Sequence, residues 1–379
     1  MKKKTAVVAG QICLDLCPVF PPKENKRVED VLLPGKLTSV DDFEMFLGGA
    51  VPNTGLAMQK QGADVRYMGK VGKDSFGDVI RNMLKAAGGS ADYLITDEKV
   101  NTSCTVVLAP KGLDRMFVQY AGVNDTFCYD DIHFEDIKDA ALFHFGYPGI
   151  MKQMYVDGGS EMIKIFKKVK EMGVATSLDM VMIDPASEAA KTDWRKLIKE
   201  IIPYVDFFVP SAAELAFMMD RPLFDEWLRR ADGGDVTEHL SISKDIKPLA
   251  DQLMEWGAKV VLIKCGLPGI YLRTADEETL AKAGSQVADY LKSWANEERF
   301  EESYVAEVVK SGVGAGDTTI AAFLNSMLME YPLEKCLQYA VGTGASCVEE
   351  YDSLTGVMTF DQLEERIKKG WKKQGLYRE

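Results

Sequence analysis

The sequence predicts an α/β protein built on a mostly parallel sheet with helices on both faces. Short apolar runs rich in β-branched residues alternate with helix-length amphipathic segments along most of the chain. Most of the runs are largely apolar, which is typical of parallel strands buried on both faces. The chain has 379 residues, of which 46% are hydrophobic. This length suits one large α/β domain with a small appendage, or two domains.

The predicted elements follow one another in the order that this class requires. Strands are expected at residues 6–9, 65–68, 103–108, 116–119, 142–145, 175–178, 207–209, 260–264, 270–273 and 306–309. Helices are expected at residues 53–61, 76–86, 158–172, 212–219, 245–256, 317–330 and 333–349.

Two regions interrupt the alternation. Residues 16–47 are polar and rich in proline, with a strand-like segment at 37–40, and residues 100–120 read as a hairpin that turns at 110–114. Together, segments 12–47 and 100–120 are expected to form a small antiparallel lid over a site. The alternative is that they are peripheral strands of the main sheet. Two further hydrophilic stretches, 220–243 and 276–302, are expected to be surface insertions without chemistry.

The charge and the cysteine content exclude several classes of function. The formal net charge of −13 argues against a general nucleic-acid binder, which usually presents a basic face. No apolar run reaches the roughly 18 residues of a membrane span, and no signal peptide is recognisable, so a cytoplasmic protein without a membrane partner is expected. Seven scattered cysteines and three histidines favour reduced, buried thiols over a zinc site.

A glycine-rich loop near the C-terminus is the strongest functional signal. Gly312, Gly314 and Gly316 directly precede Asp317 and a long apolar helix. Glycines allow backbone N–H groups to approach a ligand, and a helix N-terminus favours an anion such as phosphate. A carboxylate in that position would repel a resting phosphate. It suits a general base that removes a proton from a hydroxyl next to the phosphate.

A second glycine signal lies near the N-terminus. Gly48 and Gly49 precede a helix that carries Asn53, whose amide can donate to and accept from hydroxyl groups. The alternative is a glycine turn with Asn53 as a helix N-cap. Asp15 follows the first strand, and strand ends in such sheets are where ligands bind.

These motifs resemble the PfkB (ribokinase-like) family of carbohydrate and nucleoside kinases. The resemblance rests on Gly48-Gly49-Ala50-Val51-Pro52-Asn53, on Gly69-Lys70-Val71-Gly72-Lys73-Asp74-Ser75-Phe76-Gly77 and on Gly314-Ala315-Gly316-Asp317. Their order and spacing match over roughly residues 5–350. The resemblance implies a ribokinase-like three-layer α/β/α sandwich, a single domain over residues 1–379, and a small β-sheet lid.

The resemblance also implies roles for individual residues. Asp317 corresponds to the general base, and the amides of Gly314, Ala315 and Gly316 correspond to the anion hole for the transferring phosphate. Asp15, Gly48, Gly49 and Asn53 correspond to the contacts with the acceptor sugar.

The nucleotide side is implied in the same way. Gly266 and Gly269 would let the backbone approach ATP, and Lys264 would reach a phosphate or be a solvated lysine at a strand end. Val341 and Ala345 would pack against adenine or simply against neighbouring helices. Glu214 would act on Mg²⁺ through water, whereas Ser211 replaces the usual asparagine of the nucleotide site. Ser311 and Gly312 also depart from the family pattern, which leaves dependence on a monovalent cation undecided.

Other polar residues follow predicted strands. His144 would contact sugar or be a satisfied core histidine. Asp179 and Asp184 would face substrate or nucleotide, and Arg115 on the hairpin would meet an anionic substrate or be an ordinary exposed arginine.

The expected function is therefore an ATP-dependent, Mg²⁺-requiring sugar kinase that phosphorylates a primary hydroxyl. The alternatives are a nucleoside kinase of the same family and a non-catalytic sugar-binding regulator. A dinucleotide-dependent oxidoreductase is disfavoured, because its G-x-G-x-x-G turn belongs to the first strand–helix unit. By resemblance to the family, a homodimer through the lid is possible.

Overall fold

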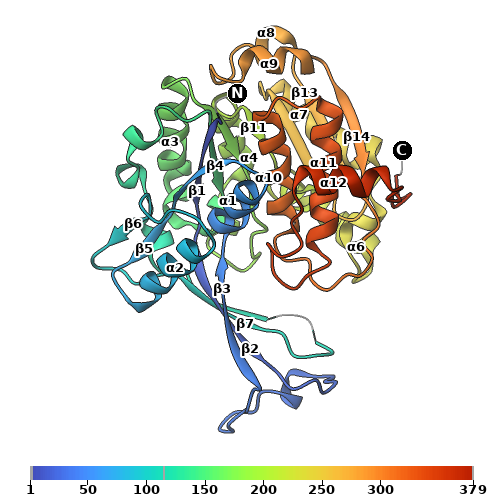
Figure 1. The fold of residues 1–379 in the computed structure, drawn as a ribbon. Coiled ribbons are helices and arrows are strands. Elements are labelled where there is room, and N and C mark those ends of the chain that lie inside the picture. Colours follow the sequence, from blue (N-terminus) through green and yellow to red (C-terminus); the bar gives the residue numbers. More distant parts are fainter. Residues whose placement is uncertain (1–2, 114–115, 378–379) are drawn as a thin grey trace.

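A computed structural model describes residues 3–113 and 116–377, and its central layer is an eight-stranded sheet (Figure 1). The strand order is β14-β13-β12-β11-β10-β9-β1-β4. The strands from β4 to β12 are parallel, whereas β13 and β14 join antiparallel at one edge. Their bounds are β1 Thr5–Gly10, β4 Asp64–Met68, β9 Leu142–Gly146, β10 Ala175–Leu178, β11 Phe207–Phe208, β12 Val260–Lys264, β13 Gly269–Thr274 and β14 Glu298–Glu302.

Helices cover both faces of this sheet. One face packs against α1 Ala50–Lys60, α2 Ser75–Ala86, α8 Glu277–Leu280, α9 Ala288–Leu291, α10 Ala315–Leu328 and α11 Leu333–Cys347. The other packs against α3 Ser160–Glu171, α4 Trp194–Ile201, α5 Ala212–Met219, α6 Arg221–Ala231 and α7 Lys247–Glu255. The last helix, α12 Phe360–Lys368, lies outside α11.

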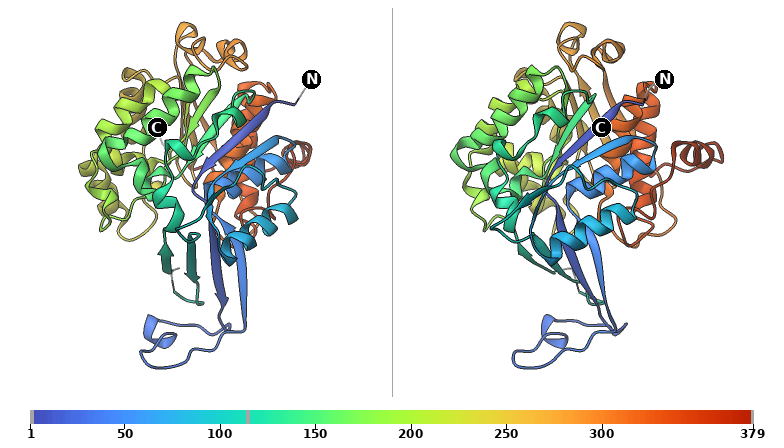
Figure 2. Two further views of the ribbon diagram at one scale, coloured as in Figure 1. Left: turned by 90° about the vertical axis from the view of Figure 1, so that its left-hand side faces the viewer. Right: turned by 60° about the vertical axis from the view of Figure 1, so that its left-hand side comes forward.

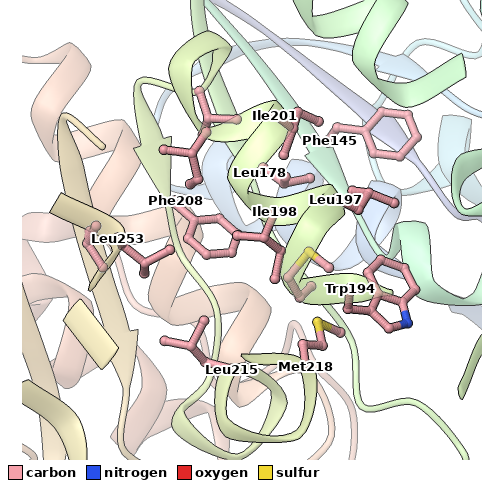
Figure 3. Close-up of a cluster of buried hydrophobic side chains, with 14 of the residues drawn as sticks. Phe145, Leu178, Trp194, Leu197, Ile198, Ile201, Phe208, Leu215, Met218 and Leu253 are labelled. Atoms are coloured by element: carbon pink, nitrogen blue, oxygen red, sulfur yellow. The ribbon is translucent and has the colours of Figure 1, made fainter. Parts of the chain in front are cut away.

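The two hydrophobic cores explain why the strands of the main sheet are mainly apolar. On β1, Ala6 and Val8 belong to one core, whereas Val7 and Ala9 belong to the other. Successive side chains of a strand point to opposite faces, so a strand buried on both sides is mainly apolar, with few polar residues such as His144 of β9. Figure 3 shows part of the second core, where Phe145, Leu178 and Phe208 from the sheet meet Ile198 of α4 and Leu253 of α7.

A separate four-stranded sheet projects from the body and carries a long loop at its far end (Figure 2). Its order is β3-β2-β7-β8, with bounds β2 Cys13–Val19, β3 Asp42–Gly48, β7 Cys104–Leu108 and β8 Met116–Tyr120. These strands come from segments 12–47 and 100–120, so the alternative of peripheral strands in the main sheet is wrong. The expected antiparallel arrangement holds within each hairpin, but β2 and β7 pair in parallel, because each is the first strand of its hairpin. A two-stranded sheet of β5 Lys70–Gly72 and β6 Ile95–Asp97 lies beside α2.

Two of the predicted strands are wrong. Residues 306–309 form no strand, and Val309 is 70% exposed there. The strand-like segment 37–40 is irregular as well, and the chain enters β3 only at Asp42. The last strand of the main sheet is instead β14, whose charged sequence ERFEE suits an exposed edge rather than a buried strand.

The two hydrophilic stretches are also more than surface insertions. Segment 220–243 contains α6, which buries Phe224 and Trp227. Segment 276–302 contains α8, α9 and β14, and it buries Leu280 and Trp294. Their many charges lie on the exposed sides of amphipathic elements. No helix in the described part of the chain is long and apolar enough to cross a membrane.

Candidate active site

The glycine-rich loop ends at the start of α10. Gly314 is the residue before the helix and has φ 71°, a left-handed conformation that glycine adopts without strain. A Cβ on Gly314 would lie 2.2 Å from Cβ of Ser353, so no larger residue fits. A Cβ on Gly316 would lie 3.5 Å from Cε of Lys264. The loop is therefore packed between a C-terminal turn and a lysine, and the positive end of α10 lies beside it.

Asp317 lies in the first turn of α10 and is only 2% exposed. Its Oδ2 accepts hydrogen bonds from Tyr147 Oη at 2.8 Å and from Asn53 Nδ2 at 3.0 Å. Its Oδ1 is buried and accepts no hydrogen bond from any residue that the structure describes. Burial raises the pKa of Asp317 to about 6, although the bonds from Tyr147 and Asn53 oppose the rise. The two oxygens of this carboxylate thus have different surroundings.

Asn53 is held in one orientation by a residue from the far end of the chain. Ser353 Oγ donates to Asn53 Oδ1 at 2.8 Å, which leaves the amide nitrogen facing Asp317. The helix α1 begins three residues before Asn53, and Gly49 is its N-cap residue. The alternative role of Asn53 as an N-cap is therefore wrong.

The diglycine joins the small sheet to α1, and both glycines are required by close packing. A Cβ on Gly48 would lie 2.4 Å from Asp15 Oδ2. Gly49 has φ 99°, and a Cβ there would lie 2.0 Å from Gln11 Oε1. Asp15 itself lies on β2, where burial raises the pKa of its carboxyl group, partly opposed by hydrogen bonds from Cys13 and Thr105. The segment thus connects the strand pair that carries Asp15 with the helix that carries Asn53.

A buried ion pair lies behind the glycine loop, where β10 and β12 end. Lys264 Nζ is 2.6 Å from Asp179 Oδ1 and donates to the Val209 carbonyl at 2.8 Å. Burial lowers the pKa of Lys264, but the carboxylates of Asp179, Glu214 and Asp317 outweigh that effect and leave the pKa raised. The Lys264 side chain is only 12% exposed, so the alternative of a solvated lysine is wrong. This ammonium group is a fixed positive charge near Gly316.

Ser211 and Glu214 form a capping box at the start of α5. The Ser211 N–H donates to Glu214 Oε2 at 2.7 Å, and the Glu214 N–H donates to Ser211 Oγ at 3.3 Å. Ser211 therefore has a structural reason to be present. Among the described residues, no three His, Cys, Asp or Glu side chains converge as a protein-only metal site. Mg²⁺ usually keeps several waters and phosphate oxygens, so a single carboxylate such as Glu214 fits its chemistry.

The other residues predicted for the nucleotide side have clear packing roles. Gly266 and Gly269 form the turn between β12 and β13, with φ 66° and 141°. A Cβ on Gly269 would lie 2.1 Å from the Glu301 carbonyl oxygen. Val341 and Ala345 are 3% and 5% exposed and belong to the core beneath α11. Turn geometry and core packing are enough to explain why these four residues are present. A role in nucleotide binding therefore stays a prediction.

Several polar residues singled out by the sequence lie apart from this cluster. His144 is fully buried, its Nδ1 lies 3.0 Å from Ser177 Oγ, and burial lowers its pKa to about 3. It is therefore a neutral core histidine, but its Nε2 is buried without a hydrogen-bond partner among the described residues, so the ring is only half satisfied and a contact with sugar stays a prediction. Asp184 is exposed and accepts from the Ala186 N–H. In the second glycine motif, Asp74 caps α2 through Gly77 and accepts from the Thr102 N–H, so it holds elements together. Arg115 lies outside the described residues.

Sequence reasoning assigned no role to two residues of the cluster, although the segment that contains Tyr147 was expected to line the substrate cleft. Tyr147 follows β9 in the segment Phe145-Gly146-Tyr147-Pro148, where a tyrosine before proline at a strand end was the available signal. Ser353 lies in an irregular turn after α11, where the sequence carries no motif. Both residues contact the cluster only because the fold brings distant segments together.

Comparison with known proteins agrees with this architecture. The ribokinase of Arabidopsis thaliana, solved in complex with ribose and ATP, superposes with a TM-score of 0.69 at 19% identity, covering 97% of this chain and 99% of that one. A putative ribokinase II from E. coli, solved with ATP and Mg²⁺, gives a TM-score of 0.67 at 19% identity, with coverages of 97% and 99%. The predicted ribokinase-like fold is thus confirmed.

Sequence comparison supplies the family. An uncharacterized sugar kinase of Archaeoglobus fulgidus is 23% identical over 302 residues, which cover 80% of this chain and 98% of the relative. The profile of the pfkB family carbohydrate kinases matches residues 17–359. Because that match spans far more than half of the chain, this protein belongs to the pfkB family of carbohydrate kinases, which are phosphotransferases.

Proposed function

We propose that this protein transfers the γ-phosphate of ATP to a primary hydroxyl of a small sugar, with Asp317 as the general base. The observation that carries the proposal is the Oδ1 atom of Asp317, a buried carboxylate oxygen without a partner among the described residues. It lies at the head of α10, beside a loop that has the form of an anion site. An acceptor hydroxyl bonded to Oδ1 would satisfy this atom.

The residues then divide the reaction between them. Asp317 Oδ1 accepts the proton as the acceptor oxygen attacks the phosphorus atom, a role worth roughly 10²–10⁴-fold in rate. The backbone amides of Gly314, Ala315 and Gly316 stabilise the negative charge on the transferring phosphoryl group. Lys264 adds a positive charge behind Gly316. Positioning and electrostatics supply most of the catalysis in such reactions.

The acceptor side is formed by the small sheet and the start of α1. Asp15 and Asn53 would bind hydroxyl groups, and the absence of side chains on Gly48 and Gly49 lets the backbone approach the sugar. The small sheet would act as the lid of a single kinase domain. Glu214 would hold Mg²⁺ through water, and Ser211, Gly266, Gly269, Val341 and Ala345 would border the nucleotide. Mg²⁺, when bound, neutralises charge on the phosphates.

The test is ATP consumption with Mg²⁺ against ribose, fructose, other small sugars and nucleosides. We expect turnover with a sugar, and we expect Asp317→Asn to abolish it while ATP binding, measured by calorimetry, persists. Asp184→Asn is the matched control, because Asp184 is an exposed aspartate that caps only a local turn. Near-normal turnover in Asp317→Asn would refute the base assignment.

A nucleoside acceptor is the second candidate, and it has one supporting observation. Phe46 lies directly opposite Asp15 in the small sheet, and Phe117 lies on the same face one row further out. Aromatic rings on the acceptor side can stack on a nucleobase. Preferential turnover of nucleosides in the same panel would favour this candidate. Sugar-stimulated turnover of any kind would exclude the non-catalytic regulator.

We also propose that the other face of the small sheet binds a second copy of the chain. Met45, Leu16, Val106 and Val118 form one apolar row across the four strands on that face. Met45 and Val118 are 47% and 62% exposed, and Phe43 next to this row is 51% exposed. Contiguous exposed apolar surface on one face of a sheet marks an interaction site.

A further inference from the structure

Tyr147 has an unusual backbone conformation. Its φ and ψ are 67° and 42°, in the left-handed region that bulky residues rarely adopt. The next residue is Pro148, and a following proline restricts the backbone further toward extended conformations. Such strain persists only where surrounding structure enforces it, and it is enriched at functional sites. The conformation therefore calls for an explanation in what the side chain does.

The side chain reaches the proposed catalytic base. Tyr147 Oη donates to Asp317 Oδ2 at 2.8 Å, across 170 residues of sequence. Asn53 Nδ2 donates to the same oxygen, and Ser353 fixes the orientation of that amide. Two donors thus converge on Oδ2, one from the residue after β9 and one from α1, whereas Oδ1 has no partner among the described residues.

We propose that Tyr147 is a positioning residue, which together with the Ser353–Asn53 pair occupies Oδ2 and assigns Oδ1 of Asp317 as the atom that takes the proton. This inference rests on the proposed function and adds to it a specific oxygen and two residues outside the recognised motifs. Two hydrogen bonds to one oxygen restrain rotation of the carboxylate, so its other oxygen keeps one direction toward an acceptor hydroxyl.

The surroundings of Asp317 predict how its titration responds. Lys264 from β12 and the bonds from Tyr147 and Asn53 lower the pKa of Asp317, whereas burial and Glu214 from α5 raise it. Asp179, directly after β10, and Cys347 from α11 also lie near enough to interact with its charge. Loss of the phenol hydroxyl removes one lowering contribution and leaves the others in place, so the pKa must rise.

The principal test is Tyr147→Phe, which keeps the ring and removes only the hydroxyl. We expect kcat to fall about tenfold or more, as for loss of a hydrogen bond to a charged group, while the acceptor KM changes little. The acid limb of the kcat/KM profile should move to higher pH by about one unit. Tyr67→Phe is the control, because it removes another hydroxyl with a hydrogen bond, to Gln59 Oε1, in α1 and β4 away from Asp317.

A second readout needs no turnover. The difference in Tm between the protein and its Asp317→Asn variant, followed against pH, reports the pKa of the folded carboxyl group. The pH at which this Tm difference changes should rise when Tyr147→Phe is introduced into both proteins. It should stay the same when Tyr67→Phe is introduced instead. If Tyr147→Phe does not fold, Ser353→Ala tests the same role. This change removes the hydrogen bond that orients the Asn53 amide, so the pH at which the Tm difference changes should again rise.

The outcomes separate the inference from the proposed function. If no acceptor is phosphorylated, or Asp317→Asn remains active, the proposed function fails. If the protein is an Asp317-dependent kinase but Tyr147→Phe shifts neither the acid limb nor the Tm transition, only the positioning role is overturned. A fall in stability without either shift would likewise mean that Tyr147 is merely structural.

Discussion

The charge of one carboxyl group should set the pH range in which the protein works. Burial raises the pKa of Asp317 to about 6, and only the ionised form can accept a proton. We therefore expect kcat/KM for the acceptor to rise with pH through about 6 and to level off above about 7. Initial rates at saturating Mg²⁺ and ATP, between pH 5 and 8, measure this. An acid limb near 4, the value of an exposed aspartate, would contradict the buried environment.

The same residue should make the folded protein less stable at neutral pH. The pKa of Asp317 is higher in the folded state than its ordinary 3.8, so ionisation opposes folding, and stability is lost as pH rises through about 6. A shift of about two units corresponds to about 3 kcal/mol. Asp317→Asn should therefore raise the free energy of unfolding at pH 8 by up to this amount and bring little gain at pH 4. Denaturant melts at both pH values test it, and an equal gain at both would contradict it.

Some residues of the site were predictable and others were not, for a physical reason. Gly314, Asp317, Gly48 and Asn53 belong to local patterns in which backbone approach or helix position dictates the residue type. Tyr147 and Ser353 act through contacts made at distances of 170 and 300 residues along the chain. The position of Tyr147 before proline at a strand end marks it as unusual, but no local pattern encodes its partner or that of Ser353, so the fold was needed to identify these contacts.

At the scale of an element, the glycine loop offers a matched pair of substitutions. Gly314→Ala forces a left-handed alanine and brings its Cβ to 2.2 Å from Cβ of Ser353. We expect the loop to shift and kcat to fall roughly 10²-fold or more, as when an oxyanion donor is lost. Gly312→Ala changes the same loop two residues earlier, where a Cβ has no neighbour within 4 Å. It should retain near-normal kcat, and equal loss in both variants would contradict the steric account.

Strands were predictable where both faces are buried and unpredictable at the edges. The apolar runs of β1, β9, β10 and β12 agree with the expected positions within one or two residues. In contrast, β14 pairs along one side with β13 and carries four charged residues, so its sequence resembles a solvated loop. Segment 306–309, with Ala306, Val308 and Val309, looks like a strand but makes no ladder. Apolarity predicts burial in a sheet, whereas edge strands depend on pairing alone.

At the scale of the whole molecule, the apolar outer face of the small sheet predicts the state of assembly. We expect the protein to sediment as a dimer and Val118→Lys to sediment as a monomer, because a charge would be buried in the interface. Leu228→Lys is the control, since Leu228 is 46% exposed on α6, in the body of the molecule. A monomer for the unaltered protein at every concentration would rule out the interface.

The contact between Ser353 and Asn53 has a consequence for how the protein is made. A ribosome that adds about 5–20 residues per second needs roughly 15–60 s to cover the 300 residues between them. Asn53 and Tyr147 have therefore left the ribosome well before Asp317, and Ser353 follows last. A nascent or prematurely terminated chain lacking the turn after α11 has its glycine loop without the residue it packs against. Because Ser353 orients the Asn53 amide, the contact between Asn53 and Asp317 takes its final form only after residue 353 has been made.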